Sequence, residues 1–376
     1  MDFKEIRHHL HSIAEPSGFE TKTSAFIIEK LKETQPSKII KFKTGTHFLC
    51  EYDFGEEGKT VLFRADMDAV LVDESEGNLN YRSVNKGVSH KCGHDGHSTI
   101  LLNMAEKLHE KPLQKGKVLL LFQGAEETGQ GANDILNDTV LSRYKIDTAY
   151  ALHNIPGEEK GAIICKTGSF TCSVVSCEIV LTGKTAHAAE PWNAVSPYPA
   201  AEKIAEKVLG FNNFNISADD FCVATLIEFH IGEKAYGVAA GNGVLRFTIR
   251  TKTDGRLRGI QEEIERTVRE ETGKTHGLES GISWIEHFAA AENRKPAVAT
   301  IRHCAGSLGL RYIEKESPFF WGEDFGLFTQ RFDGALFGLG SGTAQPPLHH
   351  PDFDFPDDII ETGASMFYEI AKNELC

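Results

Sequence analysis

Hydrophobic and polar positions follow two different periods in the first part of the chain. Residues 2–14 and 20–34 place apolar side chains at helical spacing, which predicts two amphipathic helices. Residues 59–64 and 117–122 are short apolar runs typical of buried strands, and residues 98–110 between them return to the helical period. Strands that alternate with helices in this way favour an α/β fold, in which helices flank a mainly parallel sheet.

The pattern changes between residues 172 and 290. Residues 177–181 and 243–250 alternate like half-exposed strands. Residues 198–210 and 256–271 have the helical period. Two helices on one antiparallel sheet form an α+β layer, so we predict an inserted domain of ferredoxin-like type at residues 172–290. The first domain then consists of residues 1–171 and 291–376.

Composition argues against several classes of protein. The 376 residues include 40 basic and 54 acidic ones, and the net charge of -14 disfavours nucleic acid or an anionic membrane as the main partner. No run reaches the ~18 apolar residues of a membrane span, and the first residues lack the apolar core of a signal peptide. We therefore expect a cytoplasmic protein. The eight cysteines show no disulfide-framework spacing and are expected to be reduced thiols.

Acidic and histidine side chains follow the ends of four predicted strands. The strands at residues 59–64, 117–122, 147–152 and 336–340 lead to Asp66 and Asp68, to Glu126 and Glu127, to His153, and to the loop with His349 and His350, respectively. In open α/β sheets, ligands bind outside the carboxyl ends of the strands. We therefore expect these side chains to share one crevice.

The segment from Ser89 to His97 adds one thiol, three imidazoles and a carboxylate. These are ligand types of zinc and its neighbours, whereas a polar loop with a chance cysteine is the simpler alternative. The metal-ligand candidates are Cys92, His94, Glu127, His153 and His349, with Asp66, Asp68, Asp95, His97 and His350 as second choices or supports of a ligating imidazole. Five ligands are more than a single tetrahedral site with one open position needs, and they suit two divalent ions that share a water.

An ordered set of motifs extends over nearly the whole chain. It comprises Arg64–Ala69, Cys92–His97, Ala125–Glu127, Leu152–His153, Gly183 with His187, Ala188 and Pro191, Glu323–Phe325 and Leu348–Pro351, preceded by Arg7, His11, Glu20 and Thr23. This set resembles the amidohydrolase branch of the aminoacylase and metallo-carboxypeptidase family. That branch includes hippurate hydrolases, plant auxin-conjugate hydrolases and N-acetyldiaminopimelate deacetylases.

The resemblance implies a dinuclear-metal hydrolase of N-acyl amino acids. It also implies a catalytic α/β domain interrupted by a small lid domain that mediates formation of a homodimer. By position, the five first-choice candidates match the family's metal ligands, and Glu126 matches its general base. His187 matches the lid histidine that stabilises the oxyanion.

The chain departs from the family pattern at three places. Val70 and Leu71 follow the first motif where the family commonly has proline, and Gly124 replaces a proline before Ala-Glu-Glu. In the lid, Gly237 replaces an asparagine that helps to hold substrate in the family. The substrate class is therefore less firmly indicated than the type of reaction.

The site that the resemblance implies would hydrolyse an amide with a water that the metals activate and Glu126 deprotonates. Zinc or manganese is the expected metal, with nickel or cobalt as alternatives, because mixed sulfur, nitrogen and oxygen donors admit all four. Arg246 and Arg250 are candidates for binding a substrate carboxylate, which an Arg fork matches well.

Three other hypotheses use the same residues. A dipeptidase or aminopeptidase would use the same metals but recognise a free α-amine. A cysteine hydrolase based on Cys92 and His94 would leave Glu127, His153 and His349 without a role. A non-catalytic metal-binding homologue would have no need to retain Glu126.

Overall fold

The computed structural model describes residues 1–74 and 79–375. The chain forms two compact units. The large unit consists of the described residues within 1–170, 291–316 and 323–376, and the small unit of residues 171–290 and 317–322. The segment 317–322 joins the small unit because Phe319 forms a bridge with Thr171 and accepts a hydrogen bond from the backbone of Cys172. The sequence pattern did not indicate that residues 317–322 belong to the small unit.

The large unit is built on a mixed sheet. Its strands are β1 (Lys38–Lys41), β2 (Phe48–Asp53), β3 (Thr60–Asp66), β4 (Lys117–Gln123), β5 (Thr148–Pro156), β6 (Ile163–Cys165), β15 (Tyr312–Glu314) and β16 (Asp333–Gly342). They lie in the order β1-β2-β4-β3-β5-β16-β6-β15. The central neighbours β4, β3, β5 and β16 are parallel, as are β6 and β15, whereas β1 with β2, β2 with β4, and β16 with β6 are antiparallel. The central strands therefore end at one edge of the sheet.

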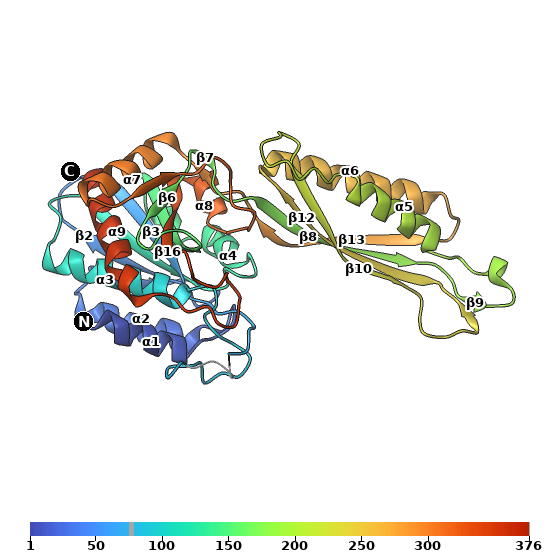
Figure 1. Ribbon diagram of the computed structural model, residues 1–376, viewed down its shortest axis with the longest axis horizontal. Coiled ribbons are helices and arrows are strands. Elements are labelled where there is room, and N and C mark those ends of the chain that lie inside the picture. Colours follow the sequence, from blue (N-terminus) through green and yellow to red (C-terminus); the bar gives the residue numbers. More distant parts are fainter. Residues whose placement is uncertain (75–78, 376) are drawn as a thin grey trace. The chain divides into compact units, whose positions relative to one another are not determined.

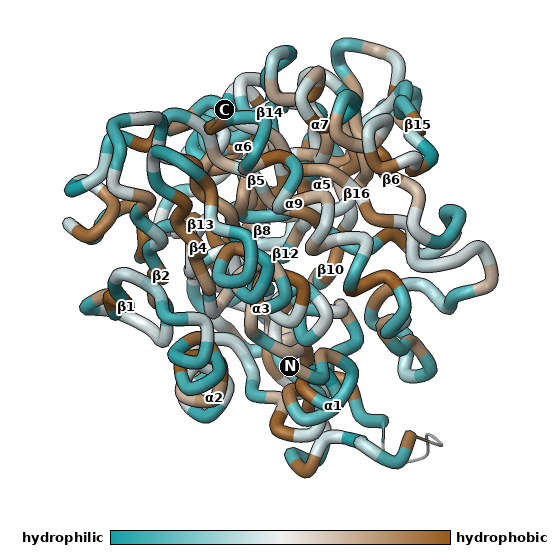
Figure 2. The backbone as a smooth tube through the Cα atoms, turned by 90° about the vertical axis from the view of Figure 1, so that its left-hand side faces the viewer, coloured by the Kyte–Doolittle hydropathy of each residue, from teal (hydrophilic) through white to brown (hydrophobic). Residues whose placement is uncertain are grey.

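Amphipathic helices cover this sheet: α1 (Phe3–Ser12), α2 (Thr21–Glu33), α3 (His94–Glu110), α7 (Lys295–Ser307) and α9 (Ile360–Leu375). Their apolar residues share one hydrophobic core with the central strands, in which Leu101, Phe122 and Phe367 are fully buried. Figure 1 shows α3 and α9 side by side against the sheet. In Figure 2 the tube of α2 changes repeatedly between hydrophilic and hydrophobic colours, as expected of a helix with one buried face.

Shorter elements complete the large unit. They are α4 (Gly131–Asn137), α8 (Gly326–Arg331), the 3-10 turns η1 (Leu141–Arg143) and η3 (Asp357–Ile359), and the paired strands β7 (Gly168–Ser169) and β14 (Glu292–Asn293). Among the described residues, no helix is both long and apolar enough to cross a bilayer.

The small unit has its own antiparallel sheet and its own core. Its elements are β8 (Ser173–Thr182), β9 (Ala186–His187), η2 (Pro191–Asn193), α5 (Tyr198–Leu209), β10 (Cys222–Ile231), β11 (Val238–Ala239), β12 (Asn242–Thr251), α6 (Asp254–Gly273) and β13 (Glu279–Phe288). The long strands lie in the order β10-β12-β8-β13, and Ile204 of α5 and Ile264 of α6 are buried with Ile179 of β8 in one cluster. The predicted fold class, a mainly parallel α/β sheet interrupted by an α+β insertion, is confirmed.

One helix begins earlier than the sequence pattern predicts. The apolar period indicates a start near residue 98, but α3 begins at His94. Gly93 precedes it with a φ of 97°, a left-handed conformation that glycine adopts readily. A Cβ at this position would lie 2.4 Å from Oδ1 of Asn154. Gly93 thus places His94 on the first turn of a helix instead of in a loop.

Candidate metal centre

Side chains from the ends of the central strands converge with the start of α3. Asp66 ends β3 and Glu126 follows β4, while His153 lies within β5, and His349 lies in the loop after β16. The loop of His349 is held beside the thiol of Cys92, because the backbone N–H of His349 donates to the carbonyl of Lys91 at 2.8 Å. As predicted, these residues therefore come together at the carboxyl ends of the strands.

The donor atoms of the five first-choice ligands lie close to one another. Cys92 Sγ is 3.6 Å from His153 Nε2, and Glu127 Oε1 is 3.7 Å from His94 Nε2 and 3.4 Å from His349 Nε2. Donor atoms fall within 4.8 Å of one another in several groups, including Cys92–His94–His153, Cys92–Glu127–His349 and His94–Glu126–Glu127. Two of these groups share Cys92 and together contain all five candidates.

The chemistry of these donors fits divalent cations. His94 Nε2 and Glu127 Oε1 are buried and lack a hydrogen-bond partner among the described residues, a costly state for polar atoms. Burial opposes protonation of His94, but Asp66 and Asp68 outweigh it and raise its pKa to about 10. The surroundings therefore favour positive charge at this imidazole, and a metal ion would replace its proton.

Carboxylates and a backbone carbonyl contact the Nδ1 atoms of the imidazoles. Asp68 Oδ1 lies 3.2 Å from His94 Nδ1, and Asp66 Oδ1 lies 2.6 Å from His97 Nδ1. The Nδ1 of His153 lies 2.9 Å from the carbonyl oxygen of the next residue. These contacts leave Nε2 of His94 and His153 directed at the cluster, which is how outer contacts orient metal-binding imidazoles.

Glu126 lies at the edge of this cluster and is 5 % exposed. Its Oε2 is 4.0 Å from His94 Nε2, and its Oε1 accepts a hydrogen bond from the backbone N–H of Asp324 at 3.3 Å. Burial and the negative charges of Glu323 and Glu127 raise the pKa of Glu126 well above its ordinary value. A carboxyl group in this setting can accept and hold a proton.

A buried arginine supports the acidic residues around Glu126. Arg64 on β3 donates to Asp66 at 2.6 Å and to Asp324 at 2.7 Å, and lies 3.0 Å from Glu323. Its Nε donates to the side chain of Gln123 at 3.0 Å. Sequence reasoning assigned no role to Arg64 or Gln123, because neither residue type stands out in an apolar strand as a ligand would.

Three of the second-choice ligands, Asp68, Asp95 and His350, lie outside the ligand groups. Asp95 accepts a hydrogen bond from Arg7 at 3.1 Å and lies 2.8 Å from His11 Nδ1. His350 is about half-exposed and its Nδ1 is 3.8 Å from Asp352. Asp95 thus ties α1 to α3 in the buried interior.

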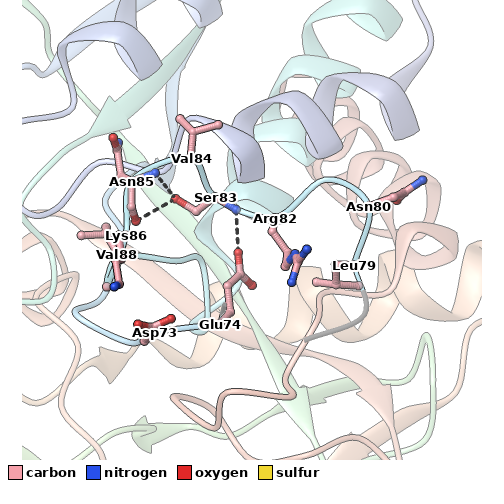
Figure 3. Close-up of a pocket in the computed structure, with 11 residues that line it drawn as sticks. Asp73, Glu74, Leu79, Asn80, Arg82, Ser83, Val84, Asn85, Lys86 and Val88 are labelled. Carbon is pink, nitrogen blue, oxygen red and sulfur yellow. Dashed lines mark hydrogen bonds between the residues drawn. The ribbon is translucent and has the colours of Figure 1, made fainter. Parts of the chain in front are cut away.

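A cavity of about 450 Å³ lies in the loop that precedes the cysteine-histidine segment, and its lining comes from residues 73–74, 79–80 and 82–88. In Figure 3, Glu74 accepts a hydrogen bond from the backbone N–H of Ser83, at 2.7 Å. The same carboxylate lies 3.1 Å from His11 and 2.5 Å from Lys91. The cavity is therefore next to the loop that holds Cys92 but is not lined by the ligand candidates.

The remaining candidates lie in the small unit. His187 in β9 is exposed, and its Nδ1 accepts a hydrogen bond from the backbone of Ala189 at 3.1 Å. Arg246 on β12 is bound by two neighbouring carboxylates, those of Glu178 and Glu228. Arg250 is half-buried, and its Nη1 donates to the carbonyl of Phe320 at 3.1 Å.

Comparisons with known proteins agree with this arrangement. The profile of peptidase family M20/M25/M40 matches residues 62–373. The chain is 31% identical over 375 residues to an N-acetyl-L-cysteine deacetylase of Bacillus subtilis, covering 98% of this chain and 87% of that protein. It is 29% identical over 370 residues to an N-acetylcysteine deacetylase of the same organism, covering 97% and 95%. A dinuclear metal-binding peptidase of the M20 family, also from Bacillus subtilis, superposes with a TM-score of 0.83 at 25% identity over 99% of this chain and 97% of that one.

Fold, donor set and relatives together define a metal-dependent hydrolase of amide bonds. The chain belongs to peptidase family M20/M25/M40. The resemblance stated from the sequence motifs is thereby confirmed.

Proposed function

We propose that the chain removes the acyl group from N-acyl amino acids, with two divalent metal ions and Glu126 as general base. The position of Glu126 gives the strongest support, because its carboxylate lies 4.0 Å from His94, at the edge of the five candidate ligands. The relatives named N-acetylcysteine deacetylases support a small N-acetyl amino acid as substrate. A homodimer and a cytoplasmic location remain predictions.

In this proposal Cys92, His94, Glu127, His153 and His349 hold the two ions, of which zinc or manganese is the expected metal. When bound, the ions supply a water of lowered pKa and positive charge for the carbonyl oxygen of the amide.

The protein's own groups move the proton. Glu126 takes a proton from the attacking water on Oε2, the oxygen nearer to His94, and delivers it to the departing amine. Its other oxygen stays bound to the backbone of Asp324, which fixes the direction of the carboxylate. From the family resemblance, His187 is proposed to donate a hydrogen bond to the oxyanion, a contribution of ~3–4 kcal/mol per donor in other hydrolases.

Metal content and deacylation measured together test this proposal. We expect about two ions per chain and release of free amino acid from N-acetyl amino acids, N-acetylcysteine included. Chelation should abolish turnover, and zinc or manganese should restore it. Release from dipeptides but not from N-acetyl amino acids would indicate the peptidase alternative. Bound metal with no turnover on any substrate would favour the non-catalytic homologue.

We propose Arg250 as the partner of the substrate carboxylate, since Arg246 is already bound to Glu178 and Glu228. Capping that carboxylate as an amide should then lower kcat/KM by about 10–100-fold, the range of a lost charge-assisted hydrogen bond. Arg250→Leu should remove the preference for the free acid, and Arg246→Leu serves as the matched control that keeps it. Equal rates on free and capped substrates with the native enzyme would refute carboxylate recognition.

A further inference from the structure

The turn that presents Glu126 and Glu127 contains an unusual backbone conformation. Two residues after the end of β4, Ala125 has a φ of 57°, in the left-handed region that costs a residue with a Cβ roughly 1–2 kcal/mol. Both carboxylates that follow Ala125 belong to one ligand group with His94. Such strain persists only where the surroundings hold it.

Side chains from three other segments accept the backbone N–H groups of this turn. The N–H of Gly124 donates to His47 Nδ1 at 3.0 Å, and the N–H of Ala125 donates to Glu20 Oε1 at 2.8 Å. Two residues further on, Asp68 Oδ2 accepts from the N–H of Glu127 at 3.0 Å. The turn is therefore held by side-chain acceptors at successive points along its backbone.

Glu20 is fully buried and is itself fixed from both sides. Its Oε1 also accepts from the N–H of Gly18 at 2.7 Å, and its Oε2 accepts from the hydroxyl of Thr46 at 2.6 Å. The carboxylate fits tightly under the turn, because a Cβ at Gly124 would lie 2.6 Å from Oε2 and 2.5 Å from the Thr46 oxygen. This contact explains why the chain has glycine at position 124.

His47, the acceptor of the Gly124 N–H, has little freedom to move its ring. Its ring is 2 % exposed and packs edge-on against Phe42, with the ring centres 6.2 Å apart. Because Nδ1 accepts from Gly124, the ring must carry its proton on Nε2. Burial lowers the pKa of His47, which favours this neutral ring.

We propose that Glu20 and His47 are positioning residues of the reaction: they hold the left-handed turn at Ala125, and thereby place the base Glu126 and the ligand Glu127. The proposal rests on the function assigned above to these two carboxylates. Glu20 and His47 act only through the backbone and touch neither metal nor substrate.

Paired variants test the role of Glu20. Glu20→Ala removes the acceptor of the Ala125 N–H, and we expect kcat to fall about 100-fold with little change in KM, the effect of a displaced catalytic group. Glu20→Gln should stay within a few-fold of native kcat, because its amide oxygen can accept both N–H groups while its NH₂ donates to Thr46. Glu15→Ala is the control, since this buried carboxylate lies near Glu20 in the sequence and accepts from the backbone of Lys22 and Thr23 instead of from Gly124 or Ala125.

Two readouts do not depend on turnover. Hydrogen exchange of the amides of Gly124 and Ala125 should be faster in Glu20→Ala than in the native protein and in Glu15→Ala. Titration with zinc should show weaker binding of at least one ion, by about 10–100-fold, the usual range for loss of an outer-shell support. If the native enzyme hydrolysed no amide at all, these two measurements would still decide the positioning role.

Variants of His47 provide an independent test if Glu20→Ala does not fold. His47→Asn keeps an acceptor close to the place of Nδ1 and should retain activity and metal affinity, whereas His47→Ala should lose both in part. The proposal is wrong if folded Glu20→Ala or His47→Ala keeps native kcat and metal affinity. It is also wrong if Glu20→Gln falls as far as Glu20→Ala, or if Glu15→Ala falls equally.

Discussion

Replacing Glu126 with glutamine is expected to lower kcat by about 10³-fold or more, because general acid–base groups of this kind contribute up to ~10⁴-fold. Glutamine has the same size and can still accept the hydrogen bond from the backbone of Asp324. It cannot take a proton from water. The variant should therefore bind the same amount of metal and bind substrate with a similar affinity, while turnover is nearly lost.

Glu127→Gln is the informative comparison, because the two carboxylates are neighbours on the same turn. We expect this variant to lose metal as well as activity, since Glu127 Oε1 lies within 3.7 Å of both His94 and His349. Metal analysis after gel filtration, with kcat and KM for both variants, separates the two roles. Near-native turnover in Glu126→Gln, or loss of metal from it, would contradict the assignment of Glu126 as the base.

The main elements of the fold could be predicted because periodicity reports burial directly. The apolar runs near β3, β4, β5 and β16 are strands with both faces covered, and residues 20–34 become α2 (Thr21–Glu33). The return of residues 317–322 to the small unit could not be predicted. It depends on a bridge between Thr171 and Phe319, which are remote in sequence and unremarkable in composition.

The convergence of the candidate ligands could also be predicted, because few structural roles require thiol, imidazole and carboxylate at the ends of strands. The residues that hold the turn of Glu126 and Glu127 could not be predicted. The left-handed φ of Ala125 has no sequence signature, since alanine rarely adopts it. Glu20 and His47 lie far from the turn in sequence, and only the fold shows that each accepts one of its N–H groups.

The second large effect concerns stability. Arg64→Leu is expected to lower the free energy of unfolding by about 3–5 kcal/mol, the cost of leaving buried charges without their partner. The guanidinium is completely buried, donates to Asp66 and Asp324, and lies 3.0 Å from Glu323. Leucine fills part of the volume but leaves these carboxylates without the cation.

Urea unfolding at 25 °C measures this effect, with Arg302→Leu as the control. Arg302 is about half-exposed and pairs with Glu314 on the surface, so its loss should leave the unfolding midpoint close to the native one. Arg64→Lys should fall between the native protein and Arg64→Leu, because an ammonium keeps the charge but cannot donate in the fixed directions of the guanidinium. A native midpoint in Arg64→Leu would mean that the three carboxylates do not need this cation. Their repulsion would then have to be relieved by protonation, which the burial of Asp324 already favours, since burial raises its pKa.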